Sequence, residues 1–181
     1  GEVERRFGRS QRIWVMDRGM VSADNVKFLS ESDRQYLLGT RRSELAAFQA
    51  ELRSGGWQSI REDVQVKAVE RDEVAYLLAR SGDRRRKERA MRRRQTRGLR
   101  DGLRKLQRRV LAGRLKQRDK IVEQVGRLKG RYPQAARLVS VCVSAEPVAV
   151  TWRWSAEALR AAFARDGAYL LQSNYRHWTP E

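Results

Sequence analysis

The first apolar run of the chain covers residues 12–16 and predicts a short buried strand. The run contains β-favouring residue types and ends at Asp17, and Gly19 then predicts a turn. After this turn, Ser22 can cap a helix that continues to about Ser30, with its apolar side chains on one face. These apolar side chains are Val26 and Leu29.

A second buried strand is predicted over residues 35–38, which are followed by Gly39 and Thr40. A helix over about residues 43–53 comes next, because apolar positions there recur three and four residues apart. Two consecutive glycines, Gly55 and Gly56, end this helix. The recurring apolar positions are Leu45, Phe48 and Leu52.

From residue 64 the apolar period changes to strict alternation. Residues 64–69 therefore predict a half-exposed strand, and residues 73–79 predict its partner. The polar residues 70–72 would form the turn between the two strands. We expect a small antiparallel element in this part of the chain.

The pattern over residues 83–130 predicts an antiparallel helical hairpin, with a break at Gly113 and a second helix over about residues 115–128. Each helix carries one narrow apolar seam. Gly98 and Gly102 lie within the first helix and weaken it by roughly 1 kcal/mol each in helix propensity. The seams consist of Leu99, Leu103, Leu106 and Val110 on the first helix and Val122, Val125 and Leu128 on the second.

After Pro133 the β-type pattern returns. Residues 138–143 and 148–154 predict two strands around a turn at 145–147. Ser155 can then cap a short helix with two apolar side chains facing inward. These inward side chains are Leu159 and Phe163.

The last predicted strand covers residues 168–171, preceded by a turn at Asp166 and Gly167 and ended by Ser173 and Asn174. Strands and helices thus occur in mixed order along the chain. The sequence predicts an α/β fold of the mixed α+β type, with a long helical hairpin set inside it.

The charge of the chain indicates what kind of partner it binds, because the 181 residues carry a formal net charge of +18. Residues 84–118 alone contain 17 Lys or Arg against two acids. A charge run is most often a solvated helix face, but a run of nearly one sign favours a polyanionic partner. Nucleic acid is the commonest such partner, and an acidic membrane surface is the second possibility.

Aromatic side chains add a weaker indication of nucleic-acid binding. Tryptophans can stack on bases, which contributes about 1–3 kcal/mol per base. Packing in a core is the competing interpretation, and we favour it for Trp152 or Trp154, which share one face of a predicted strand. The candidate stacking residues are Trp57, Trp152, Trp154 and Trp178.

Other residue counts exclude several functional classes. Cys142 is the only cysteine and His177 the only histidine, so intrachain disulfides, cysteine zinc sites and histidine-rich metal sites are excluded. The same counts argue against a Ser-His-Asp triad. The sequence contains no apolar run near 18 residues and no secretory leader at residues 1–6, which favours a cytoplasmic protein without a membrane partner.

Asp17 is the best candidate for chemistry, because a carboxylate at the end of a buried strand lies where α/β sheets place their sites. Two or three such carboxylates could hold Mg²⁺, which prefers oxygen ligands. A two-metal site of this kind could cleave phosphodiesters. The alternative is an aspartate that only opens a turn, which is common.

Several segments together resemble bacterial insertion-sequence transposases of the DDE class, whose catalytic domain is RNase H-like. The stretch from Arg12 to Met20, with Asp-Arg-Gly after a hydrophobic strand, is similar to the second-aspartate motif of that family. The segments that carry the rest of the resemblance are Tyr36-Leu-Leu-Gly-Thr40, Lys87-Glu-Arg-Ala-Met-Arg-Arg93, Gly113-Arg-Leu-Lys116 and Asp166-Gly-Ala-Tyr-Leu-Leu-Gln-Ser-Asn174.

The resemblance implies a partial RNase H-like core interrupted by a large insertion. Residues 1–40 would belong to the core, residues 41–165 to an insertion containing the basic hairpin, and residues 166–181 to a strand that returns to the core. Asp17 would be the second metal-binding carboxylate, whereas Asp166 would belong to a turn. The family's first aspartate and final glutamate would lie outside this chain, so we expect a fragment that is inactive in isolation.

The implied activity is DNA transposition by metal-dependent phosphodiester cleavage and strand transfer, with Mg²⁺ or Mn²⁺ as cofactor. Transposon ends and target DNA would be the partners, with a possible homodimer in the DNA complex, in the bacterial cytoplasm. Two alternatives stay open: a non-catalytic basic nucleic-acid-binding protein, and a helical hairpin whose leucine seam serves a partner. The candidate DNA-contacting residues are Arg84, Arg85, Arg86, Lys87, Arg92, Arg93, Arg94 and Arg97.

Overall fold

The computed structural model describes residues 5–6, 8, 13–17, 19, 22–31, 34–71 and 74–175. The chain divides into two compact units: unit 1 contains Gly1–Arg85 and Gly167–Glu181, and unit 2 contains Arg86–Asp166. The mixed α/β class predicted from the sequence is confirmed, since both sheets and helices are present. Some predicted features lie outside the described residues, namely Arg12, Arg18, Met20, Asp72, Glu73, His177 and Trp178.

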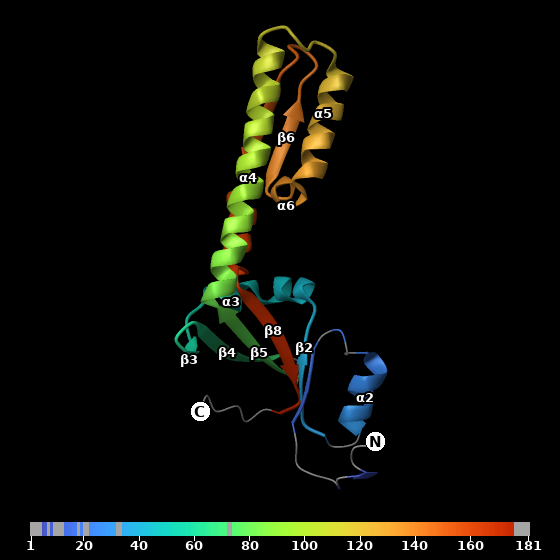
Figure 1. Ribbon diagram of the computed structural model, residues 1–181, viewed down its shortest axis with the longest axis vertical. Helices are drawn as coiled ribbons and strands as arrows, with labels where there is room; N and C mark the ends of the chain where they lie inside the picture. The colour runs from blue at the N-terminus through green and yellow to red at the C-terminus, as the bar shows by residue number, and fades with distance from the viewer. Residues whose placement is uncertain are drawn as a thin grey trace. The chain divides into compact units, whose positions relative to one another are not determined.

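Unit 1 is built on a six-stranded sheet with the strand order β1-β2-β8-β5-β4-β3 (Figure 1). The pair β1 and β2 is parallel, and every other neighbouring pair is antiparallel. The strands are β1 (Trp14–Met16), β2 (Tyr36–Gly39), β3 (Gln58–Arg61), β4 (Val64–Arg71), β5 (Val74–Ser81) and β8 (Ala168–Ser173).

The strand β1 is present as predicted, but the prediction that it is buried is wrong. It lies at the edge of the sheet with β2 as its neighbour, and Val15 is 73% exposed. Only its other face is covered, where Trp14 and Met16 pack against a small cluster that includes Leu38. A strand side chain is buried only where another element covers its face of the sheet, and an apolar run cannot reveal which faces are covered.

Helix α2 (Ala23–Glu31) forms as predicted, because the Ser22 hydroxyl accepts a hydrogen bond from the backbone amide of Asn25 at 3.1 Å. The next predicted helix is present in two parts, the 3₁₀ helix η2 (Arg42–Phe48) and helix α3 (Gln49–Arg53). The three apolar positions predicted for it are buried, and they are Leu45, Phe48 and Leu52.

The predicted antiparallel pairing of β4 with β5 is confirmed, with Arg71 opposite Val74. The pair is not a small separate element, because β5 also pairs with β8 over Ala75–Arg80 and so joins β4 and β3 to the rest of the sheet. Glu70 and Arg71 belong to β4 rather than to the predicted turn. Strand pairing across long sequence distances is a property that local patterns do not record.

Unit 2 contains the predicted antiparallel hairpin, formed by helices α4 (Gly82–Leu111) and α5 (Arg118–Arg131) (Figure 1). The first turn of α4 belongs to unit 1. The antiparallel direction follows from the contacts, since Gly98 meets Tyr132 and Gly102 meets Leu128. The remaining elements are α6 (Pro133–Ala136), the antiparallel pair β6 (Val139–Val143) and β7 (Val150–Trp154), and α7 (Ala156–Ala164).

Two predictions about which side chains face inward are wrong. Helix α5 begins at Arg118, and Ile121 is the buried residue of its first turn, whereas Val122 is 44% exposed. One residue corresponds to a rotation of about 100° on a helix, so the two neighbours cannot share a face. On α7, Phe163 is 47% exposed rather than inward.

The leucine seam of α4 is completely buried in the core of unit 2. Leu99 and Leu103 are fully buried, so the hypothesis that this seam serves an external partner is wrong. Trp152 and Trp154 pack against the same core, as the packing interpretation expected. The buried core residues are Leu99, Leu103, Leu106, Val110, Ile121, Val125, Ala135, Val139 and Val150.

Over the described ranges, no helix combines the length and the apolar character needed to cross a membrane.

Candidate functional site

Asp17 follows the last residue of β1 at the carboxyl end of the parallel pair β1 and β2. The register places Met16 opposite Leu38, so Asp17 comes level with Gly39. Gly39 is in turn opposite Leu171 of β8. Ligands in α/β sheets bind beyond the carboxyl ends of the strands, so this position suits a functional side chain.

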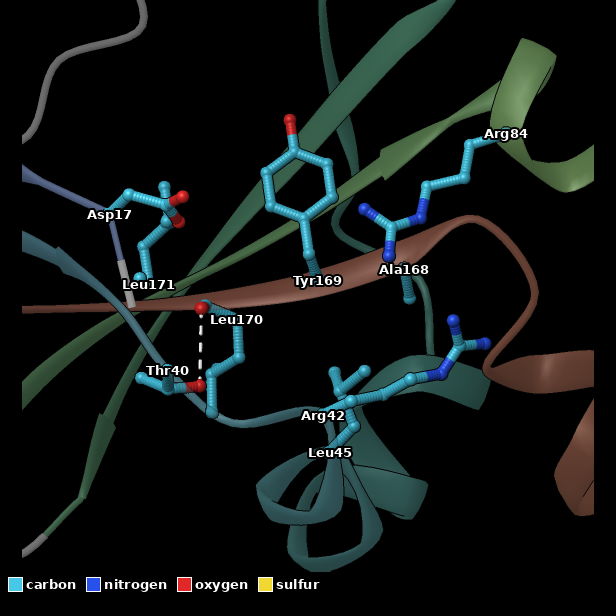
Figure 2. A pocket seen from close by; sticks show the side chains of 10 residues that line it. Asp17, Thr40, Arg42, Leu45, Arg84, Ala168, Tyr169, Leu170 and Leu171 are labelled. Carbon is cyan, nitrogen blue, oxygen red and sulfur yellow. Dashed lines mark hydrogen bonds between the residues drawn. The ribbon is translucent and has the colours of Figure 1, made fainter. Parts of the chain in front are cut away.

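A cleft of about 360 Å³ opens at this point of unit 1. Figure 2 shows Asp17 at one end of the cleft, Arg42 and Arg84 at the other, and Tyr169 between them. Backbone and side-chain hydrogen bonds from Thr40 to the carbonyl of Leu170, at 3.1 and 3.2 Å, fix the wall of the cleft. The cleft therefore presents one carboxylate and two guanidinium groups on a hydrogen-bonded frame.

Each cationic group of the cleft comes from the beginning of a helix. Arg42 is the first residue of η2, and Arg84 lies in the first turn of α4. The guanidinium carbon of Arg84 is 5.9 Å from the ring centroid of Tyr169, within the range of a cation–π contact. Guanidinium groups bind phosphate oxygens well, because their planar donors match two oxygens at once.

The start of α4 is held by Asp63, which lies in the turn between β3 and β4. The carbonyl of Asp63 accepts from the Gly82 amide at 2.8 Å, and its carboxylate accepts from the Asp83 amide at 2.6 Å. A Cβ atom on Gly82 would lie 2.1 Å from the Asp63 carboxylate, so a side chain at this position would displace the capping carboxylate. This cap fixes the turn of α4 that carries Arg84.

A divalent metal would not find a full set of ligands among the described side chains. Asp17 is exposed, and no group of three or more His, Cys, Asp or Glu side chains in the described part of the chain is placed to hold a metal ion. Mg²⁺ demands octahedral oxygen coordination, of which Asp17 alone supplies a small part. The described residues thus do not complete the magnesium site that the resemblance implies.

The predicted DNA-contacting residues are divided between the two units, with Arg84 and Arg85 in unit 1 and the others in unit 2. Two of them, Arg85 and Arg92, are not among the exposed residues. The six exposed members of the set are Arg84, Arg86, Lys87, Arg93, Arg94 and Arg97.

Arg92 is engaged inside unit 2. Both of its terminal nitrogens donate to the carboxylate of Asp166, and its guanidinium carbon lies 4.3 Å from the ring centroid of Phe163. Its side chain is 11% exposed. A guanidinium that is paired with a buried carboxylate is not available to a phosphate, so Arg92 does not belong to the DNA-contacting surface that the sequence predicts.

Sequence reasoning missed two residues of the cleft, Arg42 and Tyr169. Arg42 follows the end of β2 by three residues, and the rule about carboxyl strand ends would have indicated it once β1 and β2 were known to be parallel. Tyr169 lines the cleft because β8 pairs with β2, and no local signal in the sequence records this pairing.

Comparison with known proteins found no match, whether among family models, curated proteins or solved structures. The function must therefore be argued from the chain's own residues.

Proposed function

We propose that this chain is part of a DDE-type insertion-sequence transposase, in which Asp17 is one carboxylate of the catalytic site. The observation that carries the proposal is the position of Asp17 at the carboxyl end of two parallel strands, on a cleft that also holds Arg42 and Arg84. A carboxylate and two guanidinium groups on one cleft suit a phosphodiester, which is anionic and reacts with the help of a cation.

The proposal includes an RNase H-like core with a large insertion at residues 41–165. Its support is the order of the sequence motifs and the parallel pair β1 and β2 next to the returning strand β8. Strands β3 to β5 fall within the proposed insertion and extend the same sheet. In this view residues 86–165 of the basic unit 2 belong to the insertion.

The roles proposed for this chain's own residues are binding and orientation. Arg42 and Arg84 would hold non-bridging phosphate oxygens, and Asp17 would face the same phosphate from the other end of the cleft. Mg²⁺ or Mn²⁺ belongs to the proposal through the resemblance. Asp17 would give it one ligand, and the further carboxylates would have to come from outside the described residues.

The test is Asp17→Asn in the transposase that contains this chain, with Asp24→Asn as the matched control. Asp24 is an exposed carboxylate on α2 of the same unit, so both variants lose one negative charge. Nicking of transposon-end DNA in Mn²⁺ should fall at least about a hundredfold with Asp17→Asn, since even outer-shell partners of a metal contribute about 10–100-fold. Binding of the same DNA should change less than about twofold, because Asp17 is one charge among many. Unchanged nicking would remove Asp17 from the mechanism.

A non-catalytic basic nucleic-acid-binding protein is the second candidate, favoured by the charge of α4. The same assay separates the two candidates. A protein that binds DNA but does not nick it under any divalent cation, with Asp17 intact, supports the second candidate and contradicts the first.

A further inference from the structure

The outward face of α4 in unit 2 is a regular array of cations. The opposite face buries the seam Leu99–Val110 in the core, which leaves this face outermost. Five arginines recur at alternating spacings of seven and four residues, which keeps them on one side of a helix with about 3.6 residues per turn. Three further cations flank them. This outer cationic face consists of Arg86, Lys87, Arg93, Arg94, Arg97, Arg104, Lys105 and Arg108.

All eight side chains of the outer cationic face are exposed. Leaving Arg86 aside, none of the other seven has an ion-pair or hydrogen-bond partner for its side chain within the described part of the chain. From Arg86 to Arg108 the array covers roughly 33 Å of helix, at about 1.5 Å per residue. One acid, Asp101, lies among these cations.

This array works against the stability of α4. Like charges three or four residues apart, such as Arg93 with Arg97 and Arg104 with Arg108, destabilise a helix by about 0.2–0.5 kcal/mol per pair. A polyanion bound along the face would remove this penalty.

Helix α5 provides the contrast within the same hairpin. Its charges are of mixed sign, and Arg127 pairs with Glu123 one turn away at 2.6 Å. That arrangement is typical of a solvated helix face, which is stabilised by its own pairs. The outer cationic face of α4, with eight cations and one acid, is not of this kind.

We propose that the outer cationic face of α4 binds the phosphate backbone of double-stranded DNA, independently of base sequence. The inference deepens the proposed function, from which it takes DNA as the partner, and assigns duplex binding to unit 2. The outer cationic face is roughly 33 Å long, which matches one turn of a B-form duplex, about 34–36 Å. A straight array suits a duplex because duplex DNA is stiff over this length, with a persistence length of about 50 nm.

Two other polyanions fit the face less well. Proteins that bind single strands offer aromatic rings on which bases stack, and the outer cationic face contains no aromatic residue. A helix that lies on an acidic membrane inserts its apolar side, but the apolar side of α4 is already buried in the core of unit 2.

The test measures binding of the 181-residue chain to a labelled duplex of arbitrary sequence, about 25 base pairs long, by fluorescence anisotropy between about 50 and 300 mM KCl. Each phosphate contact contributes about 0.9 to the slope of log Kd against log salt concentration. The triple variant Arg97→Gln, Arg104→Gln, Arg108→Gln should lower this slope by about 2–3 and weaken binding at least about tenfold at about 100 mM KCl.

The matched control removes the same charge elsewhere in unit 2, through Arg118→Gln, Lys120→Gln and Arg153→Gln, all exposed and outside the face. Its slope should change by less than about 1. A second triple, with lysine in place of Arg97, Arg104 and Arg108, should keep the slope of the unmodified chain. Glutamine and lysine are both good helix formers, and superimposable far-UV circular dichroism spectra will show that α4 is intact.

Three results would overturn the inference. Equal loss in the two glutamine triples would mean that only net charge matters. Binding of a single strand of the same length as tightly as the duplex would contradict the duplex assignment, and tighter binding to phosphatidylserine vesicles would indicate a membrane. The outcome is independent of Asp17, because an Asp17→Asn protein that binds DNA without cleaving it leaves this inference intact.

Discussion

Arg92 of α4 and Asp166, which follows α7, form a bidentate ion pair inside unit 2. Their side chains are 11% and 2% exposed, so both charges are largely removed from water. Arg89 adds a second cation, with its Nε atom 3.6 Å from the Asp166 carboxylate. The pair links α4 to Asp166, the last residue of unit 2. It also holds the Arg92 guanidinium against the exposed ring of Phe163.

Breaking this ion pair from one side should destabilise the protein strongly. Asp166→Ala leaves the Arg92 charge buried without its carboxylate, and such losses cost about 3–5 kcal/mol. Replacing both partners, by Arg92→Met with Asp166→Leu, should recover most of the loss, because the remaining cation, Arg89, has a side chain that is 40% exposed and is solvated without the carboxylate. Urea denaturation followed by far-UV circular dichroism measures each free energy of unfolding. A cost below about 1 kcal/mol for Asp166→Ala would mean that the pair contributes little.

Alanine in place of Gly98 or Gly102 of α4 should destabilise the protein, whereas alanine in place of an exposed helical glycine usually stabilises it. A Cβ atom on Gly98 would lie 2.5 Å from the ring of Tyr132, and one on Gly102 would lie 2.5 Å from Leu128 Cδ2. Gly98→Ala should therefore destabilise the hairpin by about 1 kcal/mol, because overpacking costs about 1–3 kcal/mol and exceeds the gain in helix propensity.

Helix α5 supplies the control for this prediction. A Cβ atom added to Gly126 or Gly130 would meet no packed neighbour within 4 Å in the described part of the chain. Alanine at either position should therefore stabilise the helix by up to about 1 kcal/mol. Thermal unfolding of the four single variants gives the comparison. If Gly98→Ala stabilises the chain as much as Gly126→Ala, the close contact with Tyr132 is not a constraint.

The cap of α4 by Asp63 should be measurable by amide hydrogen exchange. Asp63→Ala removes the carboxylate that accepts from the Asp83 amide, and the loss of such a cap costs about 0.5–2 kcal/mol. Exchange at the amides of the first turn of α4 should accelerate, whereas exchange in α5 should not change. Asp63→Asn keeps an acceptor and should retain most of the protection. Equal acceleration in both helices would indicate general destabilisation rather than loss of a cap.

The sequence was most informative where structure depends on near neighbours. The cap at Ser22, the alternation of β4 and the glycine that breaks the hairpin are local signals, and Gly113 indeed has a positive φ of 67°. The exposure of Val15 depends on what covers its face of the sheet, which no local pattern records. The apolar character of Phe163 predicts an inward side chain, yet its ring is exposed and the guanidinium of Arg92 covers one side of it.

The candidate site shows the same division. Asp17 could be predicted because the end of an apolar run is visible in the sequence. Tyr169 could not, because it reaches the cleft only through β8, far along the chain. The low helix propensity of glycine predicts a weak point at Gly98, whereas its missing side chain makes room for Tyr132.

Strands β5 and β8 pair like the two arms of a hairpin, with Arg80 opposite Ala168 and the Ser81 amide bonded to the Gly167 carbonyl at 3.0 Å. All of unit 2 is inserted where the hairpin loop would be. During synthesis, the segment for unit 2 therefore leaves the ribosome before β8, the strand that links β2 to β5. Unit 2 can therefore fold before β8 is synthesised, whereas the sheet that carries Asp17 can be completed only after β8 has been translated. Its two parallel strands join the rest of the sheet only when β8 arrives between them and β5.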